Sequence, residues 1–146
     1  MPYTNALSAY KETRIRTASQ GQLIVLLYDE AVKQLEKSLE LITRNKSGKQ
    51  DPSSLEIIGK AIIKARDIIT ELMVSLNFDE GGEIAQNLFS LYTWFNKELL
   101  EAHIGMDIIR IGAVKNQIND LRSAWVDIAS KTSAAGQPVE GVNIAG

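Results

Sequence analysis

Apolar residues recur three or four positions apart along four long segments of this chain, and short polar or glycine-containing breaks separate the segments. This spacing gathers apolar side chains on one face of a helix, whereas a half-buried strand would need strict alternation. We predict helices over about 20–44, 52–76, 83–104 and 107–130. Short connections force neighbouring helices to run antiparallel. The sequence therefore predicts an all-α fold, an antiparallel up-down four-helix bundle.

The breaks between the segments carry recognisable signals. Asp51 and Pro52 suit the N-cap and the first position of the second helix. The adjacent glycines at 81–82 interrupt the helical pattern before the third helix, and Gly105 follows its end. We expect tight connections at these places.

The chain of 146 residues suits one domain with three parts. Residues 1–18 form an N-terminal arm, and residues 19–130 form the bundle. Residues 131–146 are small, polar and rich in Gly, so we expect a disordered tail.

Composition excludes several classes of protein. The chain has no cysteine, so disulfide frameworks and thiolate metal sites are ruled out. Its formal net charge is −2 and no basic block stands out, so we expect no nucleic-acid partner. The start of the chain is too polar for a signal peptide, and no apolar run approaches the roughly 20 residues of a membrane span. We therefore expect a cytoplasmic protein without membrane insertion.

Some helical bundles hold metal ions at catalytic sites, which requires particular side chains as ligands. A di-iron bundle site needs Glu-x-x-His pairs. His103 is the one histidine of the chain, and Leu100 stands three positions before it. Neither a nucleophile with a partner base nor a phosphate-binding loop is recognisable. We expect no catalytic residue, no metal and no cofactor.

Each predicted helix has an apolar stripe that faces the core. The predicted core positions are Ile24, Tyr28, Ala31, Val32, Leu35, Leu39 and Ile42 in the first helix; Ile58, Ile62, Ala65, Ile69, Leu72 and Leu76 in the second; Ile84, Leu88, Leu91, Tyr92, Phe95 and Leu99 in the third; and Val114, Ile118, Leu121, Trp125 and Ile128 in the fourth.

Further apolar residues lie at the edges of these stripes or opposite them. These residues are Leu23, Leu26, Ile57, Ile63, Val74, Phe89, Trp94 and Leu100. Burying one Leu or Ile is worth about 1.5–3 kcal/mol, so a few such anchors could bind an amphipathic partner helix. The arm, with Leu7 and Tyr10, could cover part of this surface when no partner is present. The alternative is a structural bundle whose exposed apolar face forms a homodimer.

Several stretches carry a resemblance to a known family. They are "AYKET" at 9–13, "LIVLLYDEA" at 23–31, "KARDIITEL" at 64–72, "SLNFDEGGEIAQNL" at 75–88 and "LRSAW" at 121–125. These stretches resemble the FliS family, the flagellin-specific export chaperones, over about residues 6–126.

This resemblance implies a function. Members of the family are helical bundles of the bacterial cytosol that bind the disordered C-terminal segment of flagellin, prevent its premature polymerisation and assist its delivery to the export gate of the flagellar type III secretion apparatus. The resemblance also implies a role for Leu7 and Tyr10 in flagellin binding. Further candidate partners are a flagellin-regulating protein and an anti-sigma factor.

Overall fold

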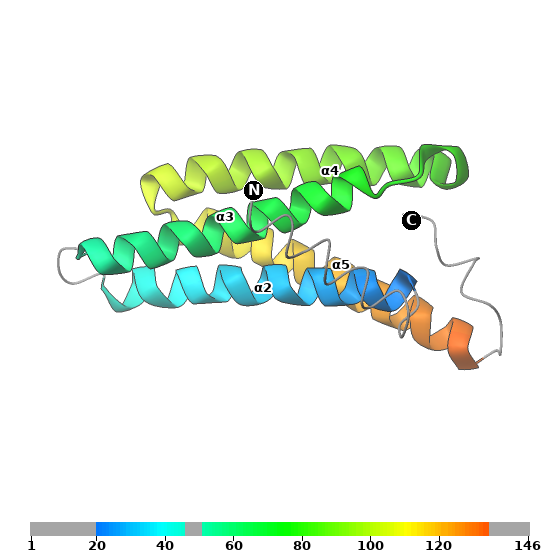
Figure 1. Cartoon of the computed structure of the whole chain (residues 1–146), viewed down its shortest axis with the longest axis horizontal. Coiled ribbons are helices and arrows are strands. Elements are labelled where there is room, and N and C mark those ends of the chain that lie inside the picture. Colours follow the sequence, from blue (N-terminus) through cyan, green and yellow to red (C-terminus); the bar gives the residue numbers. More distant parts are fainter. Residues whose placement is uncertain (1–19, 46–50, 135–146) are drawn as a thin grey trace.

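Four long helices make up most of the chain that the structure, a computed structural model, describes, which is residues 20–45 and 51–134 (Figure 1). They are α2 (Gln20–Arg44), α3 (Pro52–Val74), α4 (Phe78–Gly105) and α5 (Ile108–Ala134). No strand occurs in these described ranges. The predicted all-α class is confirmed, and α2 has the predicted bounds.

The helices pack in a ring in which each contacts two neighbours. α2 packs against α3 and α5, and α4 packs against the same two helices, but the diagonal pairs make no close backbone contact. Successive helices run in opposite directions (Figure 1). This arrangement is the predicted antiparallel up-down bundle. The arm and almost all of the tail lie outside the described residues.

Side-chain caps explain where two of the helices begin. The Asp51 carboxylate accepts a hydrogen bond from the Ser54 N–H at 2.7 Å, and Pro52 occupies the first turn of α3, as predicted. Asn77 caps α4 in the same way, because its Oδ1 accepts from the Glu80 N–H at 3.1 Å. α4 therefore begins at Phe78, five residues before the predicted start.

The glycines at 81–82 form a kink inside α4, and the prediction that they precede the helix is wrong. Gly82 has φ 51° and ψ −124°, a conformation that glycine adopts without the steric cost of a side chain. At the other end of α4, the left-handed residue is Met106 (φ 49°), one position beyond the expected Gly105. Here the Asp107 N–H donates to the Ala102 carbonyl at 2.8 Å, which ends the helix tightly.

Most of the predicted core positions are buried, but two are exposed. Ile84 is 52 % exposed because it follows the Gly82 kink at the end of the bundle. Ile128 is 40 % exposed, and Figure 1 shows the last turns of α5 extending beyond the first turn of α2, so no helix covers them on that side. Both predictions were wrong because helical spacing specifies a face of a helix but not where its neighbours end.

A polar contact crosses the centre of the apolar core. The hydroxyls of Tyr28 on α2 and Tyr92 on α4 form a hydrogen bond, and each residue is 1 % exposed. Burial raises the pKa of both phenols above the ordinary value of 10.0, while hydrogen bonds from Tyr92 and Trp125 partly oppose the shift at Tyr28. The two phenols therefore stay neutral and paired at physiological pH.

Removing one hydroxyl of this pair should lower the free energy of unfolding, because the other hydroxyl stays buried without a partner. Removing both hydroxyls should cost less than the sum of the two single removals. Tyr28→Phe leaves the Tyr92 hydroxyl buried without its partner, which costs about 1–3 kcal/mol. Tyr92→Phe should have a cost of the same order, because it leaves the Tyr28 hydroxyl buried without its partner. In urea unfolding, the double variant should lose less free energy than the sum of the single variants. Additive losses would contradict coupling between the hydroxyls.

The same pair predicts a loss of stability in alkali. Both pKa values are raised in the folded state, so above about pH 10 the unfolded chain releases protons that the folded chain keeps. The stabilisation is complete below pH 10 and declines above it, by about 1.4 kcal/mol per pH unit for each proton. Urea unfolding between pH 8 and about pH 12 should show this decline. An equally steep decline in the Tyr28→Phe/Tyr92→Phe variant would exclude these phenols as its cause.

Candidate functional site

The exposed large apolar side chains of the described residues lie on α3, α4 and α5, and none lies on α2. They are Leu55, Ile57, Ile63, Val74, Phe78, Ile84, Phe89, Trp94, Leu100, Ile104, Ile109, Val126 and Ile128, each at least 40 % exposed. Single exposed apolar residues are ordinary on protein surfaces, whereas contiguous patches mark binding sites. The question is therefore which of these residues lie together.

One group lies along the outer side of the α3–α4 pair. A hydrogen bond of 3.1 Å from Asn96 Nδ2 to Thr70 Oγ1 fixes how the two helices align. Ile63 and Val74 are seven residues before and four after Thr70, while Phe89 and Leu100 are seven before and four after Asn96. Positions i, i+7 and i+11 share one side of a helix, so each triplet is collinear.

Because α3 and α4 are antiparallel, these residues form two apolar pairs. Val74 and Phe89 lie about 6 and about 10 Å to one side of the Thr70–Asn96 hydrogen bond, at 1.5 Å per residue. Leu100 and Ile63 lie at the same distances on the other side. The centres of the two pairs are therefore about 16 Å apart, which is three turns of a helix.

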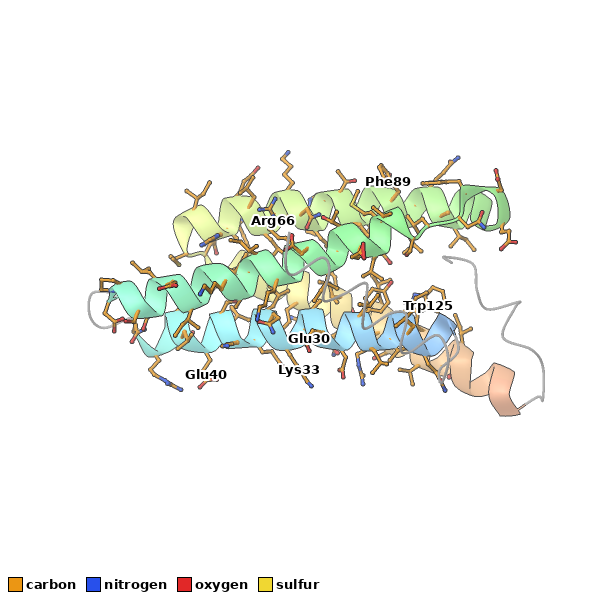
Figure 2. The ribbon with its side chains drawn as sticks, in the orientation of Figure 1. Glu30, Lys33, Glu40, Arg66, Phe89 and Trp125 are labelled. Carbon is orange, nitrogen blue, oxygen red and sulfur yellow. The ribbon has the colours of Figure 1, made fainter. Side chains whose placement is uncertain are left out.

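The kink at Gly82 enlarges the first of these pairs. The rings of Phe78 and Phe89 meet edge to face with centroids 5.9 Å apart. On a straight helix, eleven residues would separate them by about 16 Å along the axis. The kink folds the first turn of α4 back so that Phe78 joins the apolar surface. We call Ile63, Val74, Phe78, Phe89 and Leu100 the α3–α4 face; Figure 2 labels Phe89 on the outer side of α4.

A second apolar area lies between α4 and α5. An open pocket of about 250 Å³ is lined by Leu91, Gln117, Asp120 and Leu121. Trp94, one turn from Leu91, is 40 % exposed. Toward the other end of these helices, Arg110 holds α5 to α4 by ion pairs of 2.7 Å with Glu98 and Glu101, and the bidentate bond from Arg110 lowers the pKa of the Glu98 carboxyl.

The structure exposes most of the residues that the sequence assigned to partner binding. Ile57, Ile63, Val74, Phe89, Trp94 and Leu100 are all 40–75 % exposed. Leu26 is half-buried. Leu23 is 3 % exposed within the chain but is not a member of the core cluster. The prediction that it lies under a partner helix or under the arm stays a prediction. α2 packs against two helices, and its buried side is therefore wider than one stripe. Leu7 and Tyr10 lie outside the described residues.

Sequence reasoning missed Phe78, which it treated as part of a connection. The available signal was Asn77, a good N-cap residue that places Phe78 at the first position of a helix. It also missed Ile104 and Ile109, which flank the tight turn between α4 and α5 and are nearly fully exposed.

In the part of the chain that the structure describes, neither a metal-binding cluster nor a membrane-spanning helix is found. No group of three or more His, Cys, Asp or Glu side chains in them is placed to hold a metal ion. Within the same described ranges, no helix is both long enough and apolar enough to cross a bilayer. The exposed apolar residues are a further feature of the surface, and five of them make up the α3–α4 face.

Comparison with known proteins identifies the family. The sequence profile of the family described as flagellar protein FliS matches residues 3–132. The flagellar secretion chaperones FliS of Salmonella typhimurium and Escherichia coli are 31 % and 30 % identical to this chain, over 84 % and 88 % of it and 85 % and 89 % of their own lengths. The Bacillus subtilis protein of the same name is 26 % identical over 86 % of each chain. The chain belongs to the FliS family.

Proposed function

We propose that this protein is a flagellar export chaperone that binds the C-terminal segment of flagellin on the α3–α4 face. The observation that carries this proposal is the pair of exposed apolar clusters, Val74 with Phe78 and Phe89 at one end and Ile63 with Leu100 at the other. Relatives across the family are named as secretion chaperones, which supports a chaperone role and not an enzymatic one.

The spacing of the clusters suits a helix as cargo. Two anchors about 16 Å apart match residues eleven positions apart in a helix laid along the face. A disordered segment that folds on binding loses roughly 2–5 kcal/mol in ordering, and burial of two or three large apolar side chains is enough to offset it. Covering the apolar stripe of flagellin in this way would keep it from sealing against other flagellin molecules.

Delivery to the export gate of the flagellar secretion apparatus follows from this role as a second step. The α3–α4 face would be occupied by cargo at that stage, so contact with the gate would use another surface of the bundle or the cargo itself. Binding of a flagellin-regulating protein or an anti-sigma factor stays a prediction, as does the role of Leu7 and Tyr10.

A charge placed on the α3–α4 face should weaken cargo binding. Val74 is 75 % exposed, so Val74→Asp should leave the helix content and the melting temperature almost unchanged. It should weaken binding of a synthetic flagellin C-terminal segment about tenfold or more, because a carboxylate replaces an apolar anchor. Isothermal titration calorimetry measures the affinity.

The matched control is Ile109→Asp, since Ile109 is also β-branched and 77 % exposed but begins α5 instead of lying on the α3–α4 face. This variant should bind the segment as the unchanged protein does. Equal weakening in both variants would mean that binding does not distinguish the faces. Light scattering tests the alternative function, because a stable homodimer that the segment does not disturb would favour the structural bundle.

A further inference from the structure

Two buried polar atoms without partners lie where α3 and α4 meet. They are Nε of Arg66 and Oδ1 of Asn96. Buried donors and acceptors are nearly always paired, so each unpaired atom calls for a specific explanation. Arg66 is one turn before Thr70 on α3, level with Leu100 on α4, and Figure 2 labels it where α3 and α4 run side by side.

The hydrogen bonds around Thr70 determine which way the Asn96 amide faces. The Thr70 hydroxyl donates its one proton to the Arg66 carbonyl at 3.0 Å. It can therefore only accept from Asn96, so the Asn96 NH₂ group must face Thr70 and Oδ1 must face away. The unpaired acceptor is thus a consequence of the network and cannot be removed by turning the amide over.

Arg66 is a cation without an ion-pair partner in the described part of the chain. The salt bridges of the neighbouring segments belong to other residues, such as Lys60 with Glu56 and Arg110 with Glu98. The charge of Arg66 acts on the carboxylate of Asp67, the next residue, but the two form no ion pair. Nε is the one nitrogen of this guanidinium that is buried, so its terminal nitrogens reach the surface. The acceptor that fits them best is a carboxylate.

We infer that the partner helix on the α3–α4 face carries a carboxylate beside the anchor that covers Ile63 and Leu100, and that the terminal nitrogens of Arg66 bind this carboxylate. The inference rests on the proposed function for the identity of the cargo. The two apolar pairs take the anchors three turns apart, and Arg66 takes a carboxylate at the level of Leu100. An all-apolar helix would cover the terminal nitrogens of Arg66 without offering an acceptor, so Arg66 determines specificity and orientation.

The first test replaces Arg66 by Met, which keeps the length of the apolar stem and removes the charge. Fluorescence anisotropy with a labelled flagellin C-terminal segment should show binding weakened about tenfold or more, as for loss of a charged hydrogen bond. The matched control is Lys60→Met, which removes the same charge from the same helix at a side chain that is 70 % exposed. This control should change the affinity by less than about twofold. Circular dichroism establishes that both variants fold.

The second test finds the carboxylate. Each Asp and Glu of the segment is replaced in turn by Asn or Gln, and each peptide is titrated against the unchanged protein and against Arg66→Met. We expect one replacement to weaken binding to the unchanged protein about tenfold and to have no further effect on Arg66→Met.

Three results would overturn the inference. Binding that is insensitive to Arg66→Met would overturn it alone, because Arg66 would then make no contact on which the affinity depends. Self-association of the protein that Arg66→Met abolishes would assign the face to a second copy of the chain. No binding of the segment to the unchanged protein would overturn the proposed function and this inference together.

Discussion

The hydrogen bond between Tyr28 and Tyr92 joins α2 and α4, one of the two diagonal pairs of helices that make no close backbone contact. α2 and α4 lie diagonally across the bundle and make no close backbone contact, so the two hydroxyls have to meet in its centre. A slide of either helix by one turn would separate two buried polar groups in an apolar core, at a cost that apolar packing alone does not impose. The pair therefore sets the register of α4 against α2. The register of α4 in turn decides which of its apolar residues remain outside.

In this register, the exposed large apolar residues of the described helices lie on α3, α4 and α5 and not on α2. α2 packs against two neighbours, and its large apolar side chains are buried or half-buried. α3 and α4 meet through buried side chains and also carry Ile63, Val74 and Phe89 on their outer side. These residues do not contribute to the core, yet each would gain about 1.5–3 kcal/mol from being covered. A stable core and an uncovered apolar face are thus properties of the same pair of helices.

The sequence predicted the fold well because helical spacing, caps and breaks are local signals. The bounds of α2, the Asp51 cap and nearly all core positions follow from residues close in the chain. The errors at Ile84 and Ile128 share one cause, which is that burial depends on where a neighbouring helix ends. For the site, helical spacing predicted which residues point outward. It could not predict that Phe78 contacts Phe89, since that contact requires the positive φ of Gly82.

An apolar face by itself is a poor means of choosing a partner, because it gains from covering any apolar surface, including that of a second copy of the chain. Polar atoms within the face change this. Nε of Arg66 is buried when the bundle folds, but its terminal nitrogens reach the surface, and a cover that lacks an acceptor would remove them from water unpaired. In the proposed complex, the apolar pairs provide affinity, while Arg66 penalises every occupant except one with a carboxylate at the right level of its helix. A chaperone that must release its cargo benefits from this division, since discrimination is obtained without adding further apolar contacts that would slow dissociation.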